Sequence, residues 1–141
     1  MSWDLIVMNL PPGIKSIAEI ANNYKPRPLG TRSDIIAKIS SIFPQTDFSD
    51  PSRGILIVPG CLIEFSMGSQ HEVDHFAMHV RGVGKECPET VAHILAQLDM
   101  RALDTASESG LFGQDPDLRS KSFERWQSFR SHVHDLLGNE H

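Results

Sequence analysis

Three short strands in succession occupy the middle of the chain, and they constrain its fold more than any other feature. Cys61, Ile63 and Phe65 recur at every second position, as in a strand that buries one face. Pro59-Gly60 and Gly68-Ser69-Gln70 are turn sequences that separate the segments. The pattern predicts a β-meander with strands at residues 55–58, 61–66 and 73–81.

The chain before the meander contains one strand signal and one helix signal. Pro11-Pro12-Gly13 ends a compact apolar run, which is typical of a buried strand. Thr31 is a suitable N-cap for a helix that Pro44 ends. We expect a strand at residues 4–10, a surface loop at 14–30 with at most a helical turn at 16–21, a helix at 31–43 and a polar loop at 45–54.

Helical periodicity dominates the chain after the meander. Pro88 suits the first turn of one helix, and Asp115 followed by Pro116 suits the start of another. Gly138 is a reasonable end for the second helix. We expect a helix at residues 88–99, a strand at 101–105, a loop at 106–114 and a C-terminal helix at 115–137.

The order of these elements, β-α-β-β-β-α-β-α, predicts an α+β fold. A two-layer arrangement, with helices packed on a mostly antiparallel sheet, is the simplest way to bury the apolar stripes. We expect residues 1–141 to form a single domain, as is usual for this length. The first strand is expected to pair in parallel with a meander strand through the helical crossover.

Charge and composition exclude some classes of function. The net charge is −5, and the chain has no basic run, so we expect no nucleic-acid binding. The apolar run at residues 5–10 is too short for a signal peptide or a membrane span. The two cysteines, Cys61 and Cys87, form no CxxC motif. We therefore expect a cytoplasmic protein without a membrane partner or a structural disulfide.

His71, His75 and His79 are spaced four residues apart, and this spacing has two meanings. On a helix, the first two would lie on one face and could share a zinc ion. On a strand, four residues span about 13 Å, so neighbouring histidines cannot reach one ion. We favour the strand. A metal-binding protein or metal-dependent enzyme that uses this row with Glu64 or Asp74 remains the alternative.

No segment carries a recognised catalytic or cofactor-binding motif. A G-x-S-x-G sequence is absent, and Gly82-Val83-Gly84-Lys85 lacks the full spacing of a phosphate-binding loop. Glu64 could meet the row His75, His79 and Arg81 across neighbouring strands. This would be a catalytic group or a surface with cross-strand ion pairs, and we favour the ion pairs. The sequence predicts no catalytic residue and no cofactor, and it favours a protein that is not an enzyme.

The C-terminal helix combines aromatic residues with arginines, as protein interfaces often do. Its candidate interaction residues are Phe123, Trp126, Phe129 and Arg130. The alternative is that the aromatic side chains pack this helix onto its own domain. The first interpretation predicts a protein partner or a homo-oligomer.

Four segments resemble a family of small uncharacterised bacterial proteins of about this length. They are the opening Trp3-Asp4-Leu5-Ile6-Val7-Met8-Asn9-Leu10-Pro11-Pro12, Leu29-Gly30-Thr31-Arg32, Met78-His79-Val80-Arg81-Gly82 and Arg101-Ala102-Leu103-Asp104. The resemblance covers about the first hundred residues and implies a bacterial cytoplasmic protein with no assigned activity. Some small bacterial α+β proteins are immunity proteins that neutralise a toxin, and a non-enzymatic protein-binding module of this kind is our leading hypothesis.

Overall fold

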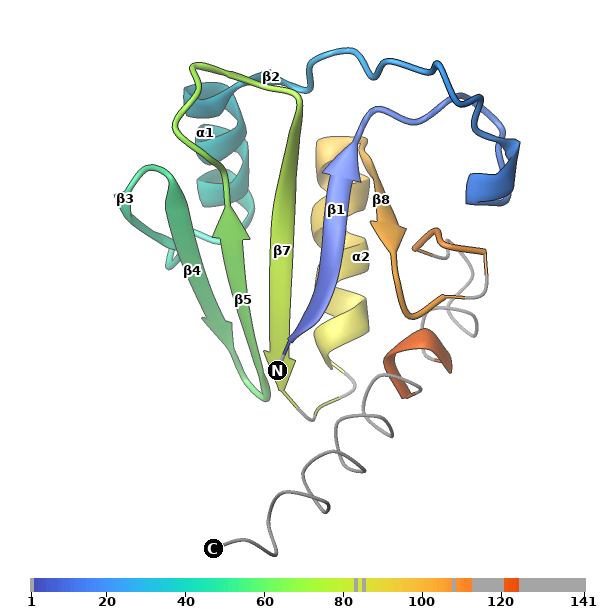
Figure 1. Ribbon diagram of the computed structural model, residues 1–141. Coiled ribbons are helices and arrows are strands. Elements are labelled where there is room, and N and C mark those ends of the chain that lie inside the picture. The colour runs from blue at the N-terminus through green and yellow to red at the C-terminus, as the bar shows by residue number, and fades with distance from the viewer. Residues whose placement is uncertain (1, 83, 85, 108, 113–120, 125–141) are drawn as a thin grey trace, which may run out of the picture.

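A computed structural model describes residues 2–82, 84, 86–107, 109–112 and 121–124 of the chain. Two α-helices lie behind a six-stranded sheet, and a two-stranded sheet lies at one end (Figure 1). The elements are β1 Trp3–Met8, the 3₁₀ turn η1 Ile17–Glu19, β2 Gly30–Thr31, α1 Arg32–Ile42, β3 Asp47–Asp50, β4 Arg53–Val58, β5 Cys61–Ser66, β6 Glu72–Val73, β7 His75–Gly82, α2 Glu86–Leu98 and β8 Arg101–Asp104. The α+β prediction is confirmed.

The large sheet has the strand order β3-β4-β5-β7-β1-β8, and all its described pairings are antiparallel. The expected parallel pairing of the first strand is therefore wrong. After β1, the long loop at residues 9–29 carries the chain across one end of the sheet to α1 (Figure 1). Strands β3, β4 and β5 then form the other side of the sheet, starting from its edge. Strand β7 lies between β5 and β1 and pairs antiparallel with both.

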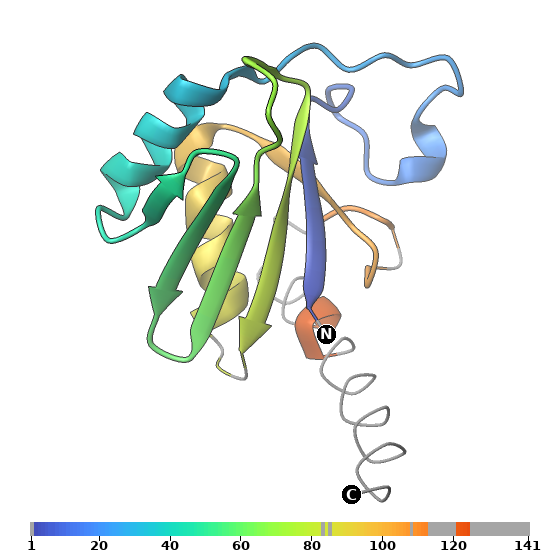
Figure 2. The ribbon, with the colours of Figure 1, turned by 60° about the vertical axis from the view of Figure 1, so that its left-hand side comes forward.

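The core lies between the sheet and the two helices, which cover the same face (Figure 2). Alternate residues of the strands point into it, as the period of two requires. In β5 these are Cys61, Ile63 and Phe65, the residues predicted to share one buried face. Helix α1 contributes Ile35 and Ile39, and α2 contributes Val91, Ile94, Leu95 and Leu98. Burial of each large apolar side chain contributes roughly 1.5–3 kcal/mol, which fixes both helices on this face.

Both predicted helix starts have local causes in the structure. The Thr31 hydroxyl accepts a hydrogen bond from the Asp34 amide at 3.2 Å and caps α1, as predicted. Helix α2 begins at Glu86, two residues before the predicted start at Pro88. Its first turn carries Glu86 and Glu89, which complement the positive end of the helix dipole.

Two predicted boundaries are wrong. Residues 45–54 are not all loop, because Asp47–Asp50 forms the edge strand β3. The carboxylate of Asp47 accepts from the Ser49 amide at 2.8 Å, and that of Asp50 accepts from the Ser52 amide at 2.9 Å, which stabilises a tight connection to β4. The expected strand at 73–81 is interrupted at Asp74, because Val73 leaves the large sheet to pair with Gly30 of β2.

The described C-terminal residues are few. Residues 121–124 are helical, and the rest of the predicted helix at 115–137 lies outside the described part of the chain. Within the described residues, no helix combines the length and the apolar character needed to cross a bilayer.

Candidate functional site

One face of the large sheet is not covered by the described helices, which lie on the opposite face (Figure 1). We call it the open face. Its side chains are exposed or half-buried, whereas those on the helix side are buried. The open face contains Asp4 and Ile6 of β1, Arg53, Ile55 and Ile57 of β4, Leu62 and Glu64 of β5, and Ala77, His79 and Arg81 of β7.

The strand register lines these residues up in rows across the sheet. One row runs Ile55, Glu64, His79 and Asp4, so two carboxylates flank one imidazole. Ile57 pairs with Leu62 in the next row, and it is 65% exposed. The open face therefore combines an exposed apolar patch with a row of ionisable groups.

Glu64 is the central acidic group of this face. It accepts hydrogen bonds from Arg53 Nη2 at 3.2 Å and from Arg81 Nη1 at 3.5 Å, and Arg53 Nε lies 3.0 Å from its other oxygen. Burial raises the pKa of Glu64, but the two arginines outweigh that effect and hold the pKa below its usual value. The predicted ion pair between Glu64 and Arg81 is confirmed, and Arg53 is a second partner that sequence analysis missed.

Asp4 and His79 form a second polar pair. Their Oδ1 and Nδ1 atoms are 2.8 Å apart, and both side chains are partly exposed. A carboxylate on one ring nitrogen orients an imidazole for proton transfer through the other. Ser2, the hydroxyl nearest in sequence, donates to Asp4 rather than to the imidazole. Sequence analysis missed this pair because it depends on β1 lying beside β7.

The other histidines do not converge with His79. The segment is extended, as predicted, so His75 and His79 lie four register positions apart along β7, opposite Met8 and Asp4. His71 precedes β6, and its backbone oxygen accepts from the Arg32 amide at 2.8 Å. Among the described residues, no group of three His, Cys, Asp or Glu side chains is arranged to hold a metal ion.

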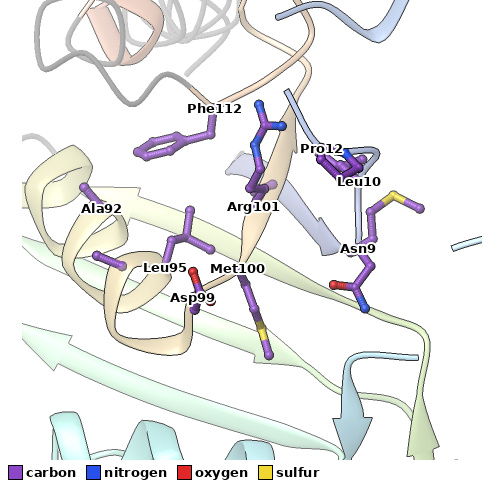
Figure 3. Close-up of a pocket in the computed structure, with 12 residues that line it drawn as sticks. Asn9, Leu10, Pro12, Ala92, Leu95, Asp99, Met100, Arg101 and Phe112 are labelled. Carbon is purple, nitrogen blue, oxygen red and sulfur yellow. The ribbon is translucent and has the colours of Figure 1, made fainter. Parts of the chain in front are cut away.

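A cavity of about 680 Å³ lies between the C-terminal end of α2, β8 and the loop after β1 (Figure 3). Most of its wall is apolar, and its polar groups are Asn9, Asp99 and Arg101. Asn9 donates to the backbone oxygens of Arg27 and Pro28, and Arg101 donates to that of Ile14. Because two of the three groups hold the loop at residues 9–29 in place, the cavity offers a ligand little polar recognition.

The glycine-rich segment after β7 does not resemble an anion site. A Cβ on Gly84 would lie 1.9 Å from Glu86 Oε2, so the carboxylate of Glu86 lies directly against this turn. A negative group of the chain itself therefore takes the place at the start of α2 where a phosphate would bind.

The candidate interaction residues of the C-terminal helix divide into two groups. Phe123 is 4% exposed and packs on Trp3, with ring centroids 5.3 Å apart. Its ring therefore belongs to the core, as the packing alternative expected. Trp126, Phe129 and Arg130 lie outside the described residues.

Comparisons with known proteins add no functional assignment, since no family model, curated protein or solved structure matches the chain.

Proposed function

We propose that this chain is a non-enzymatic protein-binding module, of the immunity-protein type, and that the open face is its binding surface. The observation that carries the proposal is the 65% exposure of Ile57 on a sheet face that the described helices do not cover. Single exposed apolar residues are common on proteins, but this one adjoins others. The resemblance to small bacterial proteins supports a bacterial cytoplasmic setting.

The neighbours of Ile57 define the chemistry of the partner. Leu62 lies beside it across the β4–β5 pair, and Ile55 is the next residue of β4 on the same face. Arg53 and Arg81 flank this patch with side chains 58% and 51% exposed, and they share a single carboxylate, that of Glu64. A complementary partner would pack an apolar side chain against this patch and present an acidic group to the arginines.

The polar pairs of the open face support a binding role over a catalytic one. Each carboxylate already has a partner of the chain itself, and within the described residues no hydroxyl or thiol hydrogen-bonds the imidazole of His79. An orienting carboxylate and an imidazole without a nucleophile lack one part of a hydrolytic site. His71, His75 and His79 do not form a group that could hold a metal ion, so their positions give no support to the metal-dependent alternative.

The test compares two substitutions of matched chemistry. Ile57 and Ile17 are the two large apolar residues that are markedly exposed in the described chain, at 65% and 49%. Wild type, Ile57→Glu and Ile17→Glu are used in cross-linking and affinity capture from extracts of the cells that make the protein, after circular dichroism has shown that each is folded. We expect a partner that Ile57→Glu loses at least tenfold and Ile17→Glu retains.

Two outcomes contradict the proposal. In the first, both variants capture the partner equally, which would move the binding surface away from the open face. In the second, wild type captures nothing and sediments as a monomer at high concentration, which would remove the binding function. Sedimentation of the three proteins also distinguishes a homo-oligomer, which Ile57→Glu alone would dissociate, from a different partner chain.

A further inference from the structure

The strongest unused feature of the molecule is a pair of buried thiols where β5 and α2 begin. Cys61 is the first residue of β5, and Cys87 is the second residue of α2. Both are free and buried, at 5% and 0% exposure. They belong to the helix side of the sheet, away from the open face, so the proposed binding function does not use them.

A glycine allows the two cysteines to approach each other. Gly82 pairs with Cys61 across β5 and β7. A Cβ on Gly82 would lie 2.8 Å from Cys87 Sγ and 3.0 Å from Cys61 Cα, so the sulfur of Cys87 occupies the space beside Cys61 that a side chain at 82 would need. The two thiols are close enough to shift each other's pKa, and Cys87 Sγ donates weakly to the Gly60 oxygen at 3.6 Å.

The surroundings make the two sulfurs chemically unequal. A hydrogen-bonding interaction with Cys61 lowers the pKa of Cys87, against the opposing effects of burial and of the Glu86 carboxylate. The same interaction, together with burial, raises the pKa of Cys61. Cys87 also lies in the first turn of α2, where the helix dipole favours a thiolate. Cys87 is therefore the thiol that reacts first as a nucleophile, and Cys61 is the resolving thiol, which then attacks the oxidised Cys87.

We propose that Cys61 and Cys87 are a reversible oxidation site that a small hydroperoxide converts to an intramolecular disulfide. The Cys87 thiolate attacks one oxygen of hydrogen peroxide, the O–O bond breaks, and sulfenic acid and hydroxide form. Cys61 then attacks the sulfur of Cys87, the S–O bond breaks, and water leaves. In total, two thiols and one peroxide give one disulfide and two waters, and a dithiol reductant reverses the change. Hydrogen peroxide is nearly as small as water, which suits thiols buried beside a turn.

The disulfide would add a covalent link between two elements that have none now. It would tie the start of α2 to the start of β5, next to the turn at Gly60. Because the linked residues lie at the ends of their elements, the change would restrict the connection between β7 and α2 while leaving the strand register intact.

The test is mass spectrometry of the full chain after treatment with hydrogen peroxide, quenching, denaturation and alkylation. We expect loss of both alkylation sites and of two hydrogen atoms, with full recovery after dithiothreitol. Arg81 and Lys85 lie between the cysteines, so trypsin separates them and a linked peptide identifies the bond. Retention of both alkylation sites, or a disulfide-linked dimer on a non-reducing gel, overturns the proposal.

Two single variants test the assigned roles. Cys61→Ser leaves Cys87 without a resolving thiol, so its sulfenic acid should be trapped by dimedone. Cys87→Ser should give at least tenfold less trapping, because Cys61 is the poorer nucleophile. Equal trapping in both folded variants contradicts the role of Cys87. If either variant fails to fold, the linked peptide from wild type still decides whether the bond forms.

Discussion

The indole Nε1 of Trp3 donates a hydrogen bond to Asp104 Oδ1 at 2.8 Å, which joins residues 101 positions apart in the sequence. Asp104 is fully buried, and its carboxylate also accepts from the Ala106 amide at 2.9 Å and the Ser122 hydroxyl at 2.6 Å. One side chain thus links β1, β8, the turn after β8 and the helical residues 121–124. A buried carboxylate with three donors is a structural group whose removal leaves each donor without its acceptor.

Asp104→Ala should therefore destabilise the protein strongly. The substitution leaves the buried donors of Trp3, Ala106 and Ser122 without this acceptor, and we expect a loss of about 3 kcal/mol in the free energy of unfolding. Urea denaturation followed by tryptophan fluorescence measures it. Asp74→Ala is the control, because Asp74 is exposed, and it should change stability by less than about 0.5 kcal/mol. Equal effects of the two substitutions would show that the Asp104 carboxylate is not a structural link.

A second prediction separates backbone strain from steric contact at glycine. Gly82 and Gly30 both have positive φ, +153° and +141°. A Cβ on Gly82 would lie 2.3 Å from the Gly60 backbone oxygen, whereas a Cβ on Gly30 would meet nothing within 4 Å. We expect Gly30→Ala to cost about 1 kcal/mol from strain alone. Gly82→Ala should cost about 2 kcal/mol more, because a backbone oxygen cannot move aside like a flexible side chain. Urea denaturation of both variants is the measurement, and similar losses would refute the steric argument.

The lowered pKa of Glu64 predicts a pH dependence of stability. Since its folded-state pKa lies below the ordinary value of 4.5, its stabilising effect is complete above that pH and is lost as the pH falls further. Wild type should exceed Glu64→Gln by less than about 1 kcal/mol at pH 7, because both arginines are half-exposed. The difference should shrink steadily as the pH falls below 4.5, and it should also shrink in about 1 M salt. Glu72→Gln, at an exposed carboxylate of β6, is the control, and a difference independent of pH would contradict the role of the arginines.

The sequence predicts those parts of the fold that depend on local pattern. The alternation of Cys61, Ile63 and Phe65 and the cap at Thr31 both appear in the structure as expected. Strand order depends on contacts between distant segments, and no local pattern encodes it. The Asp4–His79 pair therefore could not be predicted, because it exists only where β1 lies between β7 and β8.

Strand β3 shows a different limit of sequence reasoning. Its sequence, Asp-Phe-Ser-Asp, has the composition of a loop, and only Phe48 is apolar. Gly54 on the neighbouring strand β4 leaves the space that Phe48 needs to pack on the sheet, because a Cβ at position 54 would lie 2.3 Å from the Phe48 ring. The ring thus packs directly over the glycine, and it also lies 6.1 Å from the ring of Phe65. This packing of an aromatic side chain on a glycine holds the edge strand β3 against β4, although the sequence of β3 lacks the alternation of apolar and polar residues that is typical of a strand.

This contact predicts a change of sign in a double-mutant cycle. Gly54→Ala should destabilise the wild-type chain by about 1–3 kcal/mol, because the new methyl group displaces the Phe48 ring. In the Phe48→Ala background the methyl group meets no ring, and alanine should be neutral or stabilising by up to about 1 kcal/mol, since glycine is unfavourable inside a strand. The free energies of unfolding of the four proteins give the coupling energy. Additive effects would show that β3 is held by its backbone pairing with β4 and not by the packing of Phe48 on Gly54.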